Sequence, residues 1–216
     1  MLFDHAQTGP IPELPPGVIY LPGRLSRSEQ EALVRRIDEI ISKEAPLFQP
    51  TMPRTGKPFS VEMTNCGALG WVSDKTGGYR YQATHPDTGR PWPPIPDLLL
   101  TLWRQHADFP APPEACLINW YGPGTKMGSH VDQDEQEFRA PVLSVSLGDT
   151  AVFHIGGLQR SDKKIRIELA SGDVLLFGGP SRKIFHGIDR VRAGTSNLIP
   201  AGGRINLTLR RVTTAD

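Results

Sequence analysis

The spacing of apolar residues predicts two helices in the first half of the chain. Ser26 and Glu29 have the three-residue separation of a capping box at the start of the first helix, and Pro46 ends it. A second helix is predicted from Asp97 to Ala107. The apolar positions at helical spacing are Leu33, Ile37, Ile40 and Ile41 in the first helix and Leu98, Leu99, Leu102 and Trp103 in the second.

From about residue 115 onward, the apolar residues change to the short period of strands. Six short runs separated by turn residues are CLINWY, PVLSVSLG, AVFHIGG, KIRIELA, DVLLFGG and RINLTLRR. Successive short strands of this kind are typical of an antiparallel sandwich or barrel. We therefore predict a mainly β protein with flanking helices, which is an α+β fold.

Two segments lack clear periodicity. Residues 1–17 contain four prolines and are expected to form an extended arm on the surface. Residues 47–95 are rich in glycine, proline and threonine, and such a long irregular segment is usually functional or disordered. Its aromatic residues argue against disorder, and they are Trp71, Tyr79, Tyr81 and Trp92.

Composition narrows the class of protein. The 216 residues carry 38% hydrophobic and 22% charged side chains, as in ordinary globular proteins, and are enough for one domain with a substantial core. The formal net charge of +1 gives no global basic field, so contact with nucleic acid would need a local patch. Cys66 and Cys116 lie far apart in sequence and are expected to be reduced, buried thiols.

The chain shows no sign of export or membrane insertion. Its first residues have neither a basic region nor an apolar core of the signal-peptide type. No apolar run approaches the roughly 18 residues that a membrane span requires. We expect a cytoplasmic protein, and a monomer, because no segment has the pattern of a dimerisation surface.

Residues 129–136 read SHVDQDEQ and contain the first candidate for chemistry. On a strand, His130, Asp132 and Asp134 would point to the same face, and Glu135 would point away with no special role. The next histidine after the apolar run DVLLFGG is His186. Two histidines and one carboxylate form the facial triad that binds non-haem Fe(II) and leaves positions open. The alternative is an acidic, solvated turn with histidines that serve only as hydrogen-bonded structural residues.

The last strand carries an unusual polar face. In RINLTLR, the side chains of Arg204, Asn206, Thr208 and Arg210 alternate with apolar ones. If this face points inward, its arginines need anionic partners, and a carboxylate matches a guanidinium with two hydrogen bonds. Asn119 and Tyr121 would share a face of the CLINWY strand and could bind a carboxylate too. Together with an iron site, these residues indicate a cosubstrate with two carboxylates, 2-oxoglutarate. The alternative is that the polar face lies outside, in water.

These motifs resemble the AlkB family of Fe(II)/2-oxoglutarate dioxygenases, close to its bacterial DNA-repair members. The resemblance covers about residues 58–211, in the family's order and spacing. It rests on VEMTNCGALGW, GRPWPPIP, NWYGPGTKMGSHVDQDE, SVSLGDTAVFHIGGLQR, GDVLLFGGPSRKIFHGI and RINLTLR. It implies a double-stranded β-helix (jelly-roll) core at 111–216. Residues 1–110 would form the arm, helices and a nucleotide-recognition lid, with both parts in one integrated domain.

The resemblance also implies residue roles. His130, Asp132 and His186 would bind iron. Arg204 with Asn119 and Tyr121 would hold the distal carboxylate of 2-oxoglutarate, and Arg210 with Asn206 the carboxylate next to the keto group. Implied substrate contacts are Met63, Trp71, Tyr79, Lys126, Asp134 and Arg160, with Lys163, Lys164 and Arg166 as further phosphate candidates.

Two departures from the family pattern stand out. Trp120 replaces an expected basic residue, and by alternation it should face away from the cofactor. The lid carries one extra residue around Thr76 to Gly78, so the register before Tyr79 is open.

The implied reaction is oxidative demethylation of N-alkylated bases, 1-methyladenine and 3-methylcytosine, in single-stranded DNA. It would use Fe(II), O2 and 2-oxoglutarate and release formaldehyde, succinate and CO2. Double-stranded DNA and RNA are further possible partners. Alternatives are the same chemistry on methylated RNA or on a protein side chain, and a non-catalytic jelly-roll binding module. Lesion preference is not fixed by the sequence.

Overall fold

The computed structural model describes residues 11–122 and 124–215, and two β-sheets form its centre. The larger sheet has the strand order β1-β10-β7-β12-β5-β2, and the smaller has β6-β11-β8-β9. The strands of the larger sheet are β1 (Val18–Leu21), β2 (Glu62–Gly67), β5 (Ala115–Tyr121), β7 (Val142–Gly148), β10 (Val174–Phe177) and β12 (Arg204–Arg210). Those of the smaller sheet are β6 (Met127–His130), β8 (Ala151–Ile155), β9 (Ile165–Leu169) and β11 (His186–Val191). All the pairings are antiparallel, as predicted.

The two predicted helices are confirmed. Helix α1 (Arg27–Glu39) begins after Ser26, whose backbone N–H donates to the Glu29 carboxylate at 2.7 Å in the predicted capping box. A π-helical turn, η1 (Ile40–Glu44), extends it towards Pro46. Helix α2 (Asp97–His106) matches the second prediction. A 3-10 turn, η2 (Gly179–Ser181), completes the helical elements of the described residues. None of the described helices is long and apolar enough to cross a membrane.

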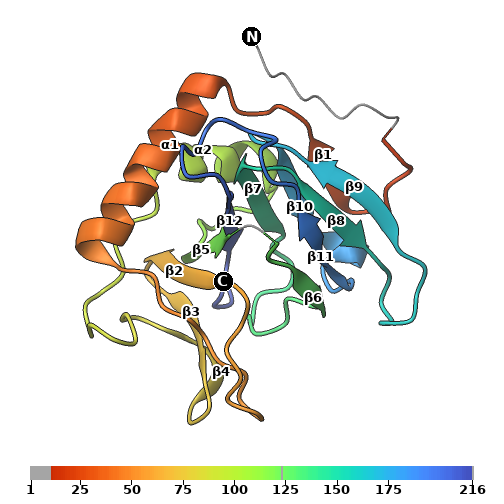
Figure 1. Ribbon diagram of the computed structural model, residues 1–216. Helices are drawn as coiled ribbons and strands as arrows, with labels where there is room; N and C mark the ends of the chain where they lie inside the picture. Colours follow the sequence, from red (N-terminus) through yellow and green to blue (C-terminus); the bar gives the residue numbers. More distant parts are fainter. Residues whose placement is uncertain (1–10, 123, 216) are drawn as a thin grey trace.

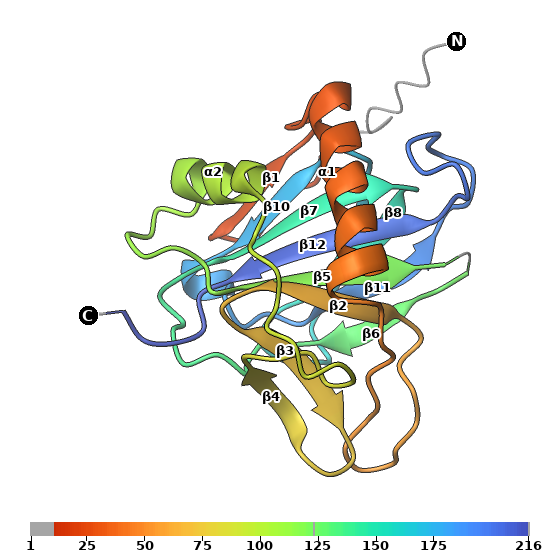
Figure 2. The same ribbon diagram turned by 90° about the vertical axis from the view of Figure 1, so that its left-hand side faces the viewer.

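Both helices lie on one side of the larger sheet, as Figures 1 and 2 show. Leu33 and Ile37 of α1 and Leu102 of α2 belong to one buried cluster with β12 residues Leu207 and Leu209. This cluster is the main core. The opposite face of β12 therefore points between the two sheets, where a second buried cluster packs strands β8–β11. The inward polar face of the last strand is thus confirmed, and its exposure to water is excluded.

The expectation that residues 47–95 are irregular is wrong. This segment contains β2 at the edge of the larger sheet, and the hairpin of β3 (Gly70–Asp74) and β4 (Gly78–Gln82). Strand β2 escaped detection because both of its faces are buried and Thr64 and Asn65 are buried with its apolar residues. Thus β1 and β2, which both precede residue 110, pair with β10 and β5. The division at residue 110 stays a prediction.

The hairpin register, left open by the sequence, is fixed by its turn. Ser73 lies opposite Tyr79, and Asp74 opposite Gly78. The Asp74 carboxylate accepts hydrogen bonds from the backbone of Thr76 (2.8 Å), and Gly78 adopts a φ of +68°, which suits glycine. In this register the aromatic residues of both strands share one face.

Cys66 and Cys116 are free and fully buried, as predicted, and lie opposite each other on β2 and β5. Burial raises the pKa of the Cys66 thiol to about 12 and that of Cys116 well above its usual value.

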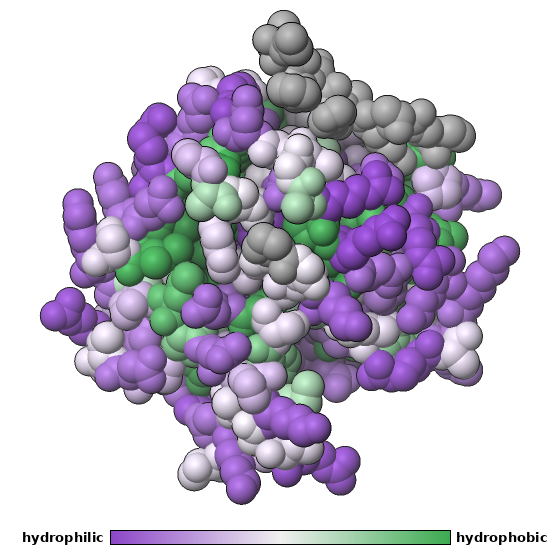
Figure 3. Space-filling model, in the orientation of Figure 1, coloured by the Kyte–Doolittle hydropathy of each residue, from purple (hydrophilic) through white to green (hydrophobic). Residues whose placement is uncertain are grey.

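The predicted surface arm lies partly outside the described residues. Only its residues 11–17 are described, and these contain no helix or strand. The face of the molecule seen in Figure 3 is mostly hydrophilic, with smaller apolar areas between the polar residues.

Candidate active site

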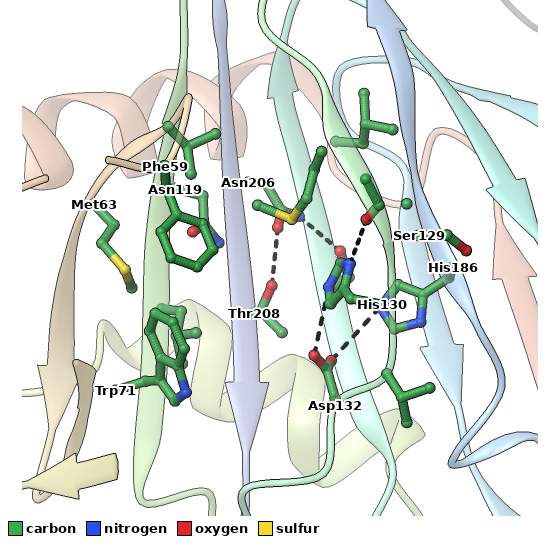
Figure 4. Close-up of a pocket in the computed structure, with 18 of the residues that line it drawn as sticks. Phe59, Met63, Trp71, Asn119, Ser129, His130, Asp132, His186, Asn206 and Thr208 are labelled. Carbon is green, nitrogen blue, oxygen red and sulfur yellow. Dashed lines mark hydrogen bonds and ion pairs between the residues drawn. The ribbon is translucent and has the colours of Figure 1, made fainter. Parts of the chain in front are cut away.

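Two histidines and one aspartate meet between the sheets. His130 ends β6 and lies directly opposite His186, the first residue of β11. The Nε2 atoms of His130 and His186 lie 3.7 and 3.8 Å from the two oxygens of Asp132. Ligand atoms of these three residues all lie within 4.8 Å of one another, and Figure 4 shows the three side chains converging. The arrangement has the donor set and spacing of a metal-binding triad.

The expectation that residues 130–134 share one strand is wrong. Strand β6 ends at His130, and residues 131–135, which we call the acidic segment, form no strand. Asp132 lies beyond the end of the strand, and Arg182 holds its backbone in place. The Arg182 guanidinium donates a hydrogen bond to the Asp132 carbonyl at 2.8 Å. Side chains from other elements thus replace the missing strand pairing.

The electrostatics of the triad suit a divalent metal. Burial, with the charge of His130, lowers the pKa of His186 to about 4, which leaves its imidazole neutral near pH 7. Burial alone would raise the pKa of Asp132, but Arg210 and the two histidines outweigh it and hold that carboxyl well below its usual range. The Nδ1 atoms of His130 and His186 lie 2.9 and 3.1 Å from backbone carbonyls, so each Nε2 is left for a ligand. Fe(II) fits these residues.

The polar face of β12 lines the cavity that lies beside the triad. The volume of this cavity is about 710 Å³. Arg204 is 1% exposed, donates to the Ser146 hydroxyl at 2.8 Å, and has a buried Nε without a hydrogen-bond partner. Within the described part of the chain, no carboxylate lies within ion-pair distance of it. Burial accordingly lowers the pKa of Arg204 to about 10. Such a buried charge suits an anionic ligand, so a dicarboxylate such as 2-oxoglutarate fits here.

Strand β5 completes this wall. Asn119 lies opposite Asn206, and Tyr121 lies opposite Arg204. Both side chains face the cavity, whereas Trp120 packs with the helix-side core, as alternation predicted. Burial raises the pKa of Tyr121, so its hydroxyl stays protonated and can donate a hydrogen bond.

Arg210 lies at the other end of β12, between two acids. Its Nη2 is 2.7 Å from Asp132 Oδ1, and its Nη1 is 2.8 Å from Glu135 Oε1. The Nε atom is buried without a hydrogen-bond partner. Burial would lower the pKa of Arg210, but Asp132, Tyr81 and Glu135 together raise it well above its usual value. The guanidinium is therefore fully charged, and only its Nε lacks a partner.

Glu135 was expected to need no special role, and this is wrong. Its carboxylate is buried and also accepts from Arg182 Nη2 at 2.9 Å and from the Tyr81 hydroxyl. Sequence reasoning missed Glu135, Arg182 and Tyr81. Nothing in the spacing of these residues indicated that they meet, because they lie in separate segments.

An aromatic platform forms the other wall of the cavity. Trp71 stacks on Tyr79 with ring centroids 5.7 Å apart, and Phe59 meets Trp71 edge to face. The Trp71 Nε1 donates to Asp134 Oδ2 at 2.7 Å, and buried Met63 also lines the cavity. Figure 4 shows Trp71 and Phe59 on the side away from His186. Phe59 is a further residue that the sequence did not single out.

The predicted basic contacts fall into two groups. Lys126 and Arg160 line the cavity, and Arg160 donates to the Ser129 carbonyl and lies 4.8 Å over the ring of Phe185. The other group, Lys163, Lys164 and Arg166, does not line it. Every residue predicted to bind metal, cosubstrate or base thus borders one cavity, while the individual roles stay predictions.

Comparison with known proteins agrees with this geometry. Residues 17–210 match the model of the 2OG-Fe(II) oxygenase superfamily. The chain is 52% identical over 200 residues to an alpha-ketoglutarate-dependent dioxygenase AlkB homolog of Caulobacter vibrioides, covering 93% of this chain and 90% of that protein. The solved structure of OsALKBH1 superposes with a TM-score of 0.76 at 33% identity, covering 92% of this chain and 100% of that one.

More distant relatives carry the names of demethylases. The DNA N(6)-methyladenine demethylase ALKBH1C of Arabidopsis thaliana is 31% identical, over 91% of this chain and 48% of its own length. The tRNA demethylase abh1 of Schizosaccharomyces pombe is 30% identical, over 72% of this chain and 57% of its own length. By the family match and the identity to AlkB, the chain belongs to the 2OG-Fe(II) oxygenase superfamily and, within it, to the AlkB dioxygenases, which require Fe(II), 2-oxoglutarate and O2.

Proposed function

We propose that this dioxygenase removes small N-alkyl groups from nucleobases by oxidation, with alkylated single-stranded DNA as its substrate. The observation that carries the proposal is the pairing of Trp71 with Asp134 in the same cavity as the His130, Asp132 and His186 triad. A flat apolar ring and an acid are what a nucleobase needs for stacking and for recognition of its edge. The names of the DNA and tRNA demethylase relatives support a nucleic-acid substrate.

In this proposal His130, Asp132 and His186 hold Fe(II). Arg204, with Asn119 and Tyr121, binds the distal carboxylate of 2-oxoglutarate, and Arg210 with Asn206 binds the carboxylate next to the keto group. The iron, with 2-oxoglutarate and O2, supplies the oxidant that hydroxylates the N-alkyl carbon, and succinate and CO2 are its other products. The N-hydroxymethyl product then loses formaldehyde and restores the base.

Asp134 gives the site its preference for a cationic base. Methylation at N1 of adenine or N3 of cytosine leaves a positive charge on the ring near neutral pH, and an adjacent carboxylate stabilises that charge. The Asp134 oxygen also accepts a hydrogen bond from the exocyclic amine. Because an alkylated base cannot pair, flipping it out of a strand costs less than flipping a normal base.

The basic side chains around the cavity would contact the strand that carries the lesion. Lys126 and Arg160 line the cavity and are exposed, as phosphate contacts must be. With a net charge of +1 and few such contacts, binding is modest and weakens as salt increases.

The test uses protein loaded anaerobically with Fe(II) and 2-oxoglutarate and then exposed to air with a single-stranded DNA oligonucleotide that carries one 1-methyladenine. Mass spectrometry follows the loss of one methylene. We expect demethylation that disappears in His130→Ala and weakens in Asp134→Ala. A matched RNA oligonucleotide and a methylated peptide run alongside. Equal or faster turnover of RNA would overturn the DNA assignment, and succinate formation without loss of a methyl group from either strand would overturn the nucleobase assignment.

A further inference from the structure

Asp132 of the metal triad and three neighbouring residues form a closed ring of contacts. Arg182 donates to Glu135 Oε2 at 2.9 Å, and Glu135 Oε1 accepts from Arg210 at 2.8 Å. Arg210 donates to the Asp132 carboxylate at 2.7 Å, and the Asp132 carbonyl accepts from Arg182 at 2.8 Å. All four side chains are buried, and their formal charges cancel.

The ring holds a part of the chain that no sheet holds. The acidic segment, residues 131–135, has no strand pairing among the described residues, yet it carries Asp132 and Asp134. Arg182 follows the η2 turn and is fixed by its own bond to the Ala140 carbonyl at 3.1 Å. Trp71 holds Asp134 at one end of the segment, while the position of Asp132 depends on the two arginines and on Glu135, the acid that joins them.

We propose that Glu135 is a positioning residue for both the metal ligand Asp132 and the cosubstrate arginine Arg210. Glu135 accepts a hydrogen bond from Nη1 of Arg210, so only Nη2 of the guanidinium contacts Asp132. The Nε, which has no partner, is then free to bind a carboxylate. The inference rests on the proposed function, which assigns the iron to Asp132 and 2-oxoglutarate to Arg210.

Loss of the Glu135 charge has a definite consequence for Arg210. Asp132 becomes the only carboxylate in contact with that guanidinium among the described residues. A guanidinium binds a carboxylate with two parallel hydrogen bonds wherever the geometry allows it. Arg210 then turns fully onto Asp132, draws the carboxylate from the histidines, and uses the edge that would receive the cosubstrate.

The experiment measures binding, and it needs no nucleic acid. Mn(II) affinity is determined by electron paramagnetic resonance titration, and 2-oxoglutarate affinity by calorimetry on the Mn(II)-loaded protein. For Glu135→Gln, we expect about a 10–100-fold loss of Mn(II) affinity, as for other residues that support metal ligands. The affinity for 2-oxoglutarate falls too, and wild-type secondary structure is retained.

Glu137→Gln is the matched control. Glu137 is equally buried two residues further on, but it pairs with Arg139 and with the backbone of Ala215 rather than with the ring. Its loss should lower stability without changing either affinity. If Glu135→Gln fails to fold, the Arg182→Lys variant tests the positioning role instead. A lysine keeps the charge but lacks the forked guanidinium that donates to both Asp132 and Glu135. We expect it to lose affinity for both ligands.

The outcomes separate the two proposals. Wild-type affinities in Glu135→Gln, or in Arg182→Lys if only that variant folds, would overturn the positioning role while leaving the proposed function intact. Equal losses in Glu137→Gln would overturn it as well, because they would show a general effect of destabilisation. Wild-type protein that binds neither Mn(II) nor 2-oxoglutarate would overturn the proposed function itself.

Discussion

Strand β12 and the acidic segment both carry residues of the candidate site, but they are held in different ways. β12 is paired along its length with β5 on one side and β7 on the other. Its backbone is fixed by hydrogen bonds that every residue except proline can make. The acidic segment lacks such pairing and is held by side-chain contacts, those of Arg182, Glu135 and Arg210 around Asp132 and that of Trp71 with Asp134. A substitution on the apolar, helix-facing side of β12 should therefore act mainly on stability, and one in the acidic segment mainly on ligand binding.

The largest expected effect is that of Asp132→Ala in the acidic segment. It removes the only carboxylate of the triad, so we expect Mn(II) affinity to fall by more than about 100-fold, beyond the loss caused by supporting residues. Arg210 keeps Glu135 as a partner, and the β-sheets remain paired. Titration monitored by electron paramagnetic resonance, with circular dichroism as a check on folding, measures this. Stoichiometric, tight Mn(II) binding by the variant would show that Asp132 is not a ligand.

The complementary change is Leu207→Ala in β12. Leu207 is fully buried on the helix side of the sheet, so we expect a loss of about 2–5 kcal/mol in the free energy of unfolding. The Mn(II) affinity of the folded protein should not change, because the polar residues of β12 point the other way. Urea unfolding measures the first quantity. Ile19→Ala, at a 48% exposed position in β1, should cost less than about 0.5 kcal/mol.

A changed Mn(II) affinity in folded Leu207→Ala would contradict the contrast between the two regions. It would mean that the geometry of β12 depends on its packing as much as on its pairing.

The same contrast explains which features could be predicted from the sequence. Alternation along RINLTLR fixes the two faces of β12 once one face is buried, so Arg204, Asn206 and Arg210 could be placed correctly. Capping residues gave the start of α1 in the same local way. In each case the signal and the structure lie within a few consecutive residues.

The features that the sequence did not reveal depend on contacts between distant segments. Glu135 meets Tyr81, Arg182 and Arg210, which lie 54, 47 and 75 residues away, and no local pattern encodes such a meeting. Strand β2 was missed because it is buried on both faces and has no alternation. The expectation of a strand beyond His130 was wrong. The alternating polar residues of SHVDQDEQ lie in a loop that side-chain contacts hold in place.

A smaller effect is expected from Trp71→Phe, which sharpens the contrast within the cavity wall. The substitution keeps an aromatic ring but removes the N–H that holds the Asp134 carboxylate at 2.7 Å. Because this bond lies near solvent, we expect a cost of about 1 kcal/mol, which is roughly a fivefold increase in KM for the alkylated oligonucleotide. The kcat should change little. Trp120→Phe makes the same change at a tryptophan that packs against the helix-side core and should leave KM unchanged, and equal effects of the two variants would contradict the role of the Trp71 N–H.

The smallest effect concerns the pH dependence of stability and a histidine outside the triad. His154 on β8 is buried, and burial lowers its pKa. The charges of Lys164 and Arg166 lower this pKa further, and Asp189 partly offsets the decrease. Protonation therefore favours the unfolded chain, where the pKa is about 6.5. The contribution to stability is fully present above that value and is lost as the pH falls through it towards the lower pKa of the folded protein.

Replacing His154 with glutamine removes this titration, so the free energy of unfolding should decline less steeply between about pH 7 and pH 5 than in the wild type. Urea unfolding of both proteins at several pH values measures the difference. The Nε2 of His154 is buried without a hydrogen-bond partner, so a neutral amide at this position avoids burying a charge at low pH. Because His154 lies outside the cavity lining, Mn(II) affinity should be equal in the two proteins. Parallel stability curves would show instead that the charge on this imidazole is tolerated in the fold, with Asp189 outweighing the effect of burial.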